Sequence, residues 1–288
     1  MEIICPSCRT RQQVDTALLP PGPATLPCKR CGKQFSLGSA RSIAVMISKG
    51  GVGKTTTAVH LAAGLALNNY KTLLVDCDTQ GQAAFMLGIR PNDGLADLIL
   101  GDTPPDKAML KARDNLWLLS GGKSLAKIKR HITRKDYAGE NTLAEALRPI
   151  ERAFQFIILD TSPSWDSLTV NVLFYAQELL APISLEVMSI QGLAEFLRNF
   201  AALRKHNPGV TLKYLLPMHL SKPSKNSQAI LESLEKFYGK YLCTPIRYSP
   251  KLAEAPAYGM TVYEYAGSDN VVKDFRELLK DVLHKDEL

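Results

Sequence analysis

The chain has 288 residues, 45% of them hydrophobic, and a formal charge of +7 at pH 7. This length predicts one large domain, or one of ordinary size with a small appendage, and the apolar content is enough for a buried core. No apolar run reaches the roughly 18 residues that span a bilayer, and the first residues lack the basic and apolar pattern of a signal peptide. We therefore expect a cytoplasmic protein without a membrane partner. The positive charge is compatible with nucleic acid but does not establish it.

Four of the six cysteines lie within the first 31 residues. Cys5 and Cys8 form one C-x2-C pair, Cys28 and Cys31 form another, and 19 residues separate the two pairs. This spacing is typical of a four-cysteine zinc site, in which metal binding replaces the core that so short a segment lacks. Iron in a rubredoxin-like site is the alternative, because it uses the same ligands. The segment resembles the small zinc ribbons of diverse bacterial proteins, and we expect it to dock a protein partner rather than to read DNA.

The composition changes at Ser42, where short apolar runs begin to alternate with longer helical patterns. This alternation predicts an α/β domain with a twisted, mostly parallel sheet flanked by helices. The predicted strands cover residues 43–47, 72–76, 116–119, 156–159, 178–183, 212–216 and 241–246. The predicted helices cover residues 55–67, 143–154, 168–177, 192–205, 227–237 and 270–283. We divide the chain into a zinc ribbon (1–37), a linker (38–41) and the α/β domain (42–288).

The sequence SKGGVGKTT at residues 48–56 follows one predicted strand and precedes a helix, as a phosphate-binding loop requires. Glycines let backbone N–H groups close around an anion, and the helix N-terminus adds its dipole. Lys54 is expected to reach the β- and γ-phosphates of ATP, Thr55 to ligate Mg²⁺, and Thr56 to bind the α-phosphate. The residues expected to hold the nucleotide are Gly50, Gly51, Val52, Gly53, Lys54, Thr55 and Thr56.

Two further apolar runs end in carboxylates. LLVDCDTQGQA at residues 73–83 carries Asp76 and Asp78, and FIILDTSPS at residues 156–164 carries Asp160. All three would lie at the carboxyl ends of parallel strands, where open α/β sheets bind their ligands. A strand that ends in an aspartate is also the pattern that holds Mg²⁺ in phosphate-loop enzymes.

The form KGGVGKTT resembles the deviant phosphate loop of the ParA/MinD group of ATPases, and KLAEAPAYGM at residues 251–260 resembles a segment of its ParA/Soj branch. The resemblance extends over nearly all of residues 42–283 and implies a phosphate-loop ATPase. It implies that Lys49 reaches the ATP of a second subunit, that Asp78 orients the attacking water, and that Asp76 and Asp160 support or hold Mg²⁺. The chain departs from the family patterns D-x-D-P-Q-G and D-x-P-P-S, with Thr79 and Ser162 in place of prolines.

ParA-like proteins bind DNA non-specifically through basic residues near the C-terminal part of the dimer. By that resemblance, the candidate DNA contacts are Lys222, Lys225, Arg247 and Lys251. Such contacts reach phosphates, so the affinity would fall steeply with salt. A second basic stretch, residues 123–135, has six lysines or arginines and no acid, and is either a further DNA patch or a solvated face.

The resemblance thus predicts a dimer that forms with ATP, binds non-specific DNA and hydrolyses ATP slowly until a ParB-like or cargo-linked protein stimulates it. Such a protein is cytoplasmic and nucleoid-associated, and it positions or segregates a plasmid, a chromosome region or a protein cluster.

Three alternatives keep the same loop. A metallocluster-handling ATPase would need cluster cysteines in the ATPase domain, where only Cys77 and Cys243 lie, and both are expected to be buried and inert. A MinD-like membrane-associated regulator would need a Lys/Arg-rich final helix, but the polar face of residues 270–283 mixes both signs, which favours a packed helix. A transcriptional or signalling adaptor would use the same ATPase switch with a different partner.

Overall fold

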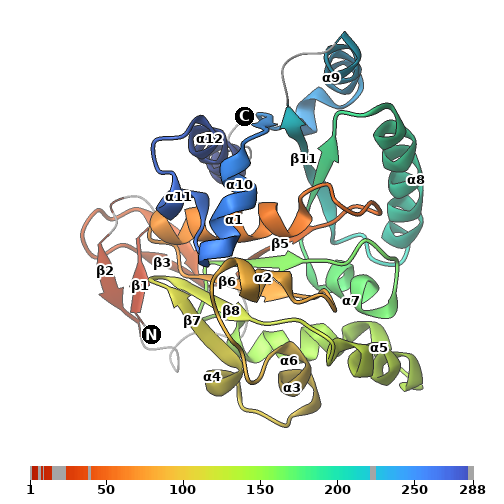
Figure 1. The fold of residues 1–288 in the computed structure, drawn as a ribbon. Coiled ribbons are helices and arrows are strands. Elements are labelled where there is room, and N and C mark those ends of the chain that lie inside the picture. Colours follow the sequence, from red (N-terminus) through yellow and green to blue (C-terminus); the bar gives the residue numbers. More distant parts are fainter. Residues whose placement is uncertain are drawn as a thin grey trace.

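The computed structural model describes residues 2–5, 8, 10–14, 24–37, 40–220 and 225–284. Its centre is an eight-stranded sheet in the order β12-β11-β10-β5-β9-β6-β8-β7 (Figure 1). The strands are β5 (Arg41–Val45), β6 (Thr72–Asp76), β7 (Met109–Arg113), β8 (Leu116–Leu119), β9 (Phe156–Asp160), β10 (Glu178–Ser184), β11 (Thr211–Leu220) and β12 (Ile246–Arg247). All neighbours pair parallel except β7 with β8. The predicted α/β fold is confirmed.

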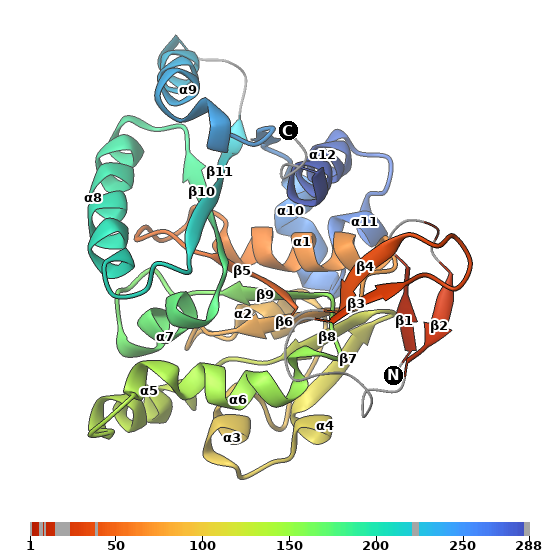
Figure 2. The same cartoon turned by 180° about the vertical axis from the view of Figure 1, so that it is seen from behind.

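Helices cover both faces of the sheet, which explains why its central strands are apolar on consecutive residues (Figures 1 and 2). One face carries α1 (Lys54–Leu67), α2 (Gln82–Met86), α10 (Pro250–Glu254), α11 (Val262–Tyr265) and α12 (Asn270–His284). The other carries α3 (Leu95–Leu100), α4 (Pro105–Ala108), α5 (Leu125–Arg134), α6 (Thr142–Glu151), α7 (Ser167–Tyr175), α8 (Val187–Arg204) and α9 (Lys225–Tyr238). None of the helices in the described ranges is long and apolar enough to cross a bilayer.

Strand order places the candidate site. The chain passes from β5 to β6 and only later inserts β9 between them, while β10 pairs with the other side of β5. The carboxyl ends of β5, β6 and β9 therefore lie side by side, and they carry the loop after β5, Asp76 and Asp160. Ligands bind open α/β sheets at such a reversal of strand order.

The predicted strand over residues 241–246 is wrong. Gly239–Tyr241 forms a 3-10 helix, Leu242 makes one isolated bridge with Leu215, and only Ile246–Arg247 pairs as β12. Pro245 has no N–H to donate to a ladder, which explains why pairing stops short of it. The helix predicted from residue 192 in fact begins at Val187. By contrast, the stripe of the final helix is buried as predicted, for example at Phe275 and Val282, and α12 packs against α1.

The described part of the N-terminal segment contains two small antiparallel hairpins, β1 (Glu2–Ile4) with β2 (Arg11–Gln13) and β3 (Ala24–Pro27) with β4 (Gln34–Leu37). Figures 1 and 2 show them beside α11 and α12, away from the loop after β5. A cavity of about 400 Å³ lies between Cys5 of this segment and residues that include Gln155, just before β9, and Arg276 of α12. The hairpins therefore sit at the opposite end of the strands from the candidate site.

Arg41, the last residue of the predicted linker, is the first residue of β5. Its guanidinium binds Glu178 of β10 in bidentate form at 2.6 and 2.9 Å and donates to the carbonyl oxygen of Val282 in α12 at 2.6 Å. Glu178 is buried, so the pair is shielded from solvent. The end of the linker is thus fixed to the sheet and to the final helix.

His60 attaches α1, the helix that follows the candidate phosphate loop, to α11 and α12. Its Nδ1 donates to the carbonyl oxygen of Thr56 at 2.7 Å, its Nε2 accepts from the N–H of Val262 at 3.1 Å, and its ring stacks on Phe275. Burial lowers the pKa of His60 to about 4. The native state therefore requires the neutral ring.

We expect His60 to make stability depend on pH. Its folded-state pKa is depressed, so its contribution is complete above pH ~6.5 and is lost as pH falls towards 4, by up to about 3 kcal/mol. Chemical denaturation of the wild type and of His60→Gln, which stays neutral throughout, measures this: the advantage of the wild type should shrink between pH 7.5 and 4.5. An advantage that stays constant over that range would contradict the assignment.

Candidate nucleotide site and cysteine cluster

Residues 48–53 connect β5 to α1 and have the backbone of an anion-binding loop. Gly51 and Gly53 adopt φ angles of 72° and 87°, in the left-handed region that favours glycine. Gly53 precedes α1, and Thr55 and Thr56 are the second and third residues of that helix, so their N–H groups lie at its positive end. A Cβ at Gly50 or Gly51 would meet no atom within 4 Å, which leaves the outer rim of the loop open.

Lys54 points back over the loop. Its Nζ donates to the carbonyl oxygen of Lys49 at 2.6 Å, and its side chain is largely buried. Burial lowers the pKa of Lys54, while the charges of Asp160 and Asp78 oppose that shift. The ammonium therefore lies between the loop and the carboxylates, where a nucleotide's phosphates would bind.

Asp160 ends β9, level with Asp76 of β6 in the sheet register. It is fully buried, and neither carboxylate oxygen has a hydrogen-bond partner in the part of the chain that the structure describes. Burial, reinforced by the charge of Asp76, raises the pKa of Asp160 well above its usual range, and the nearby Thr55 hydroxyl offsets part of this rise. An unsatisfied buried carboxylate beside a threonine hydroxyl is a donor set that suits Mg²⁺, which prefers oxygen ligands. The residues thus fit this ion.

Asp76 is also fully buried, but its oxygens are used by the chain. Oδ1 accepts from the N–H of Asp78 at 2.9 Å and Oδ2 from the N–H of Ala83 at 3.2 Å, and burial raises the pKa of Asp76 to about 6. Asp78 is half-buried, and its Oδ1 accepts from the N–H of Gln80. Asp76 therefore shapes the turn that presents Asp78, and its support of Mg²⁺ stays a prediction.

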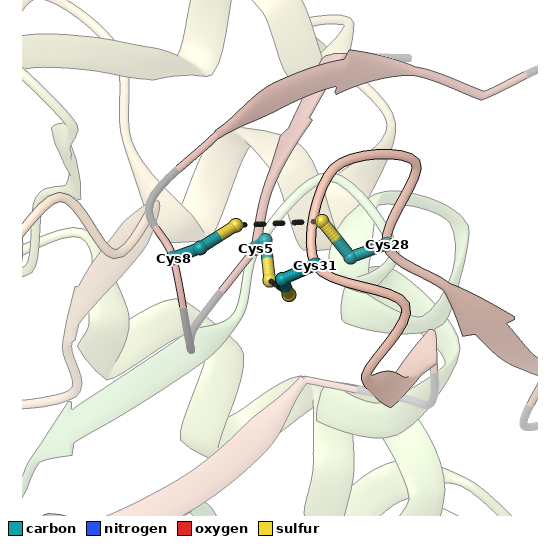
Figure 3. Close-up of side chains that lie close together, drawn as sticks. All are labelled: Cys5, Cys8, Cys28 and Cys31. Atoms are coloured by element: carbon teal, nitrogen blue, oxygen red, sulfur yellow. Dashed lines mark hydrogen bonds between the residues drawn. The ribbon is translucent and has the colours of Figure 1, made fainter.

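The four N-terminal cysteines meet in one cluster, with all four Sγ atoms within 4.8 Å of one another (Figure 3). Sγ separations are 3.5 Å between Cys8 and Cys28 and 3.7 Å between Cys5 and Cys31, close to the ~3.8 Å expected between thiolates in tetrahedral coordination with 2.3 Å bonds. Hydrogen bonding with Thr10 lowers the pKa of Cys8 to about 6. The cluster therefore fits a tetrahedral metal ion.

Comparison with known proteins assigns both parts of the chain. A family model described as an AAA domain matches residues 40–212, and one described as a zinc-ribbon domain matches residues 1–36. The chromosome-partitioning ATPase Soj of Thermus thermophilus is 33% identical over 246 residues, covering 84% of this chain and 95% of Soj. The chain belongs to the ParA/Soj family of ATPases. The predicted ATPase activity is therefore confirmed, and the chain is a partitioning ATPase with an N-terminal zinc-ribbon domain.

Solved structures support the fold. An ATP complex of a McdA variant from Cyanothece superposes with a TM-score of 0.75 at 22% identity, covering 85% of this chain and 96% of McdA. A cobyrinic acid a,c-diamide synthase from Mycobacterium smegmatis, solved with an ATP analogue and magnesium, gives a TM-score of 0.73 at 26% identity, covering 85% of this chain and 94% of the synthase. ATP with Mg²⁺ is accordingly the ligand pair that the donor set and these relatives indicate.

In this ParA/Soj-family ATPase, Lys49 lies at the open rim of the loop. Its Nζ is 3.0 Å from Oε2 of Glu186, directly before α8, and 3.5 Å from Oγ of Ser184. The side chain of Glu186 is 69% exposed, and ion pairs with such exposure contribute less than about 1 kcal/mol. Breaking the pair with Glu186 therefore costs little free energy.

The segment after Asp160 connects the loop of this ATPase to α5. The indole N–H of Trp165 donates to Oγ of Ser48 at 2.6 Å, and Asp166 caps α7 and pairs with Lys129 of α5 at 2.7 Å. Ser162, which replaces a family proline, lies 2.9 Å from the hydroxyl of Ser164 and donates to Asp166. Hydrogen bonds of Ser162 thus restrain the backbone at the position where relatives have a rigid proline.

Two of these contacts were not foreseen from the sequence. Trp165 and Asp166 follow a recognised motif, but nothing local indicates that they reach Ser48 and Lys129. Gly121 was also missed: a Cβ there would lie 2.5 Å from the carbonyl oxygen of Asp78 and 2.6 Å from Oδ1 of Asp76. The Gly-Gly pair at residues 121–122, two positions after the end of the strand predicted at 116–119, is the signal that marks this close approach.

The candidate DNA residues fall into two groups. Arg247 binds both carboxylate oxygens of Asp274, at 2.7 and 2.8 Å, and Lys251 pairs with Glu254 at 3.0 Å. Lys225 begins α9, and Lys222 lies outside the described residues. The charges of Arg247 and Lys251 are thus partly neutralised within the chain, and their role in DNA binding stays a prediction.

Proposed function

We propose that this chain is an ATP-gated dimer that binds DNA non-specifically and positions a cargo on the nucleoid, the cargo being a plasmid, a chromosome region or a protein cluster. The observation that carries the proposal is the open rim of the phosphate loop. Gly50 and Gly51 have no neighbour within 4 Å where a Cβ would lie, and Lys49 beside them pairs with the exposed Glu186. A rim of this kind suits contact with a second copy of the chain.

Each residue of the site has a role in the proposed cycle. Lys54 and the loop N–H groups hold the phosphates, and Asp78, half-buried at the mouth of the site, orients the attacking water. Thr55 and Asp160 would hold Mg²⁺, which neutralises charge on the β- and γ-phosphates. Lys49 of each subunit adds a further cation to the other subunit's ATP, so hydrolysis depends on dimerisation.

DNA binding then follows the nucleotide state. The ATP dimer doubles the basic surface that faces the phosphate backbone, and the candidate contacts are Lys222, Lys225, Arg247 and Lys251. A ParB-like or cargo-linked protein stimulates slow hydrolysis and releases the dimer. The protein would accordingly be cytoplasmic and nucleoid-associated.

A Lys49→Ala variant tests the dimer. We expect sedimentation of the wild type to show one copy without nucleotide and two with ATP and Mg²⁺, and the variant to remain a single copy in every state. Because Lys54 and the loop are intact, the variant should keep its thermal stabilisation by ATP. Lys280→Ala, which removes another lysine that pairs with a glutamate, Glu277, is the control. ATP-dependent dimerisation of Lys49→Ala at wild-type concentrations would contradict the proposal.

We further propose that the N-terminal cluster holds zinc and that the ribbon docks a partner protein. Among the described residues, only Cys5, Cys8, Cys28 and Cys31 come together as a group with metal-ligand geometry, while Cys77 and Cys243 are buried elsewhere. The described part of the ATPase domain thus holds no cysteine group of this kind, which disfavours metallocluster handling.

Metal analysis checks the zinc assignment. We expect one zinc per chain in the purified protein and none in Cys28→Ser, with the melting transition of the ribbon lost and ATP binding retained, because the two sites lie at opposite ends of the strands. Stoichiometric iron with a coloured protein, or a metal-free protein with an intact ribbon, would contradict the assignment.

A further inference from the structure

Helix α5 carries a line of cations on its outer face. Lys127, Arg130 and Arg134 lie at spacings of three and four residues, so they share one face of the helix, and Lys123 lies in the turn that begins it. All four are exposed, and residues 123–135 contain no acid. We call these four residues the α5 stripe.

The α5 stripe is not neutralised by any residue that the structure describes. Among the described residues, none of its four side chains makes an ion pair or a hydrogen bond. The other two cations of the stretch differ, because Lys129 pairs with Asp166 and Lys135 with Glu145. The stripe therefore offers full positive charges, whereas the charges of Arg247 and Lys251 are compensated.

The opposite face of α5 fixes the stripe in place. Leu125, Ile128 and Ile132 are buried in the core beneath the helix. The cations are thus presented by a rigid, packed element, which lowers the entropy that binding would cost.

The geometry points to the α5 stripe as a surface that holds the phosphate backbone of duplex DNA, an inference that rests on the proposed DNA binding. The span from Lys127 to Arg134 is about 10 Å at 1.5 Å per residue, a length over which one DNA strand presents about three phosphates. An acidic protein segment fits less well, because peptide docking relies on buried apolar anchors. Beside the stripe, only Tyr137 among the described residues exposes a large apolar side chain.

Helix α5 also contacts the segment that follows Asp160 of the nucleotide site. Lys129 pairs with Asp166, and the hydroxyl of Ser167 donates to the carbonyl oxygen of Lys129 at 3.1 Å. Both partners belong to the segment that follows Asp160. The position of α5 can therefore respond to the nucleotide, as gated DNA binding requires.

Fluorescence anisotropy with random-sequence duplex DNA tests the inference in the full chain with ATP and Mg²⁺, across a range of salt concentrations. The variant replaces Lys127, Arg130 and Arg134 with alanine, and the control replaces Lys107, Lys205 and Lys273, which are exposed elsewhere and remove the same charge. We expect the α5 variant to lose affinity at least tenfold and its log–log salt slope to shrink by about 2 to 3, with ATP turnover without DNA unchanged, and the control to change little.

The outcomes separate this inference from the proposed function. If the wild type binds DNA and the α5 variant binds equally well with the same salt slope, DNA binding by the α5 stripe is overturned, while the proposal of a DNA-binding dimer stands. If the wild type binds no DNA in any nucleotide state, both are overturned. Preference of the wild type for poly-glutamate over DNA would assign the stripe to an acidic protein segment and overturn the inference.

Discussion

An Asp160→Asn variant is expected to melt at a higher temperature than the wild type without nucleotide, and to lose most of the stabilisation by ATP and Mg²⁺. The buried carboxylate has no hydrogen-bond partner in the described chain, so its charge is costly before a ligand binds. Neutralising it should add roughly 1–3 kcal/mol, or several degrees in melting temperature for a domain of this size. Calorimetry with and without ATP and Mg²⁺ measures both effects.

The pH dependence of this gain has a defined sign. The raised pKa of Asp160 means that the native state binds a proton more tightly than the unfolded state, so wild-type stability falls as pH rises above the ordinary carboxyl pKa. The advantage of Asp160→Asn should therefore be larger at pH 8 than at pH 5. Asp102→Asn, at an exposed position, is the matched control and should change little. A lower melting temperature of Asp160→Asn without ligand would show that the carboxylate is satisfied, and would contradict the magnesium assignment.

An Asp78→Ala variant is expected to bind ATP normally but to hydrolyse it roughly 10²-fold more slowly or worse, the range for loss of a group that positions a proton acceptor or water. The ATP dimer should then persist, because its release requires hydrolysis. Single-turnover hydrolysis and the lifetime of the dimer after dilution measure the two effects.

The structural role of Asp78 requires its own control. Its Oδ1 accepts from the N–H of Gln80, so alanine also removes a turn contact. Asp78→Asn keeps an oxygen for that contact and removes the charge. If the carboxylate orients water, both variants should be slow, and if the turn alone matters, only alanine should be slow. Normal turnover in both variants would remove Asp78 from the chemistry.

The sequence was sufficient to predict those parts of the site that lie within one contiguous segment. The conformation of the loop from Ser48 to Thr56 can be predicted from the local sequence, because its glycines, the preceding apolar strand and the following helix all lie within one segment. Asp160 could be placed at the end of its strand for the same reason, although its lack of partners is visible only in the structure. The spacing of the cysteines likewise predicted their cluster.

Contacts between segments that are distant in the sequence could not be predicted from the sequence. Lys129 and Asp166 are far apart in sequence and meet because α5 and α7 pack on the same face of the sheet. The partners of Arg247 and Lys251 were missed for a related reason: a basic residue in a family motif reveals nothing of the acid beside it. From the sequence, residues 123–135 could be described only as a basic stretch. The structure shows which of its cations share one face of α5.

The proposed function requires that ATP create the dimer that holds DNA, and Gly50→Val separates dimer formation from nucleotide binding. Gly50 does not adopt a positive φ angle, and a Cβ there meets nothing within its own chain, so valine should leave the monomer and its ATP binding intact while crowding the rim where two loops meet. DNA binding is measured for both proteins with ATP, with ADP and without nucleotide. We predict retention of DNA only with ATP and only by the wild type. Equal retention of DNA by Gly50→Val, or DNA binding by the wild type that does not depend on the nucleotide, would contradict the proposed function.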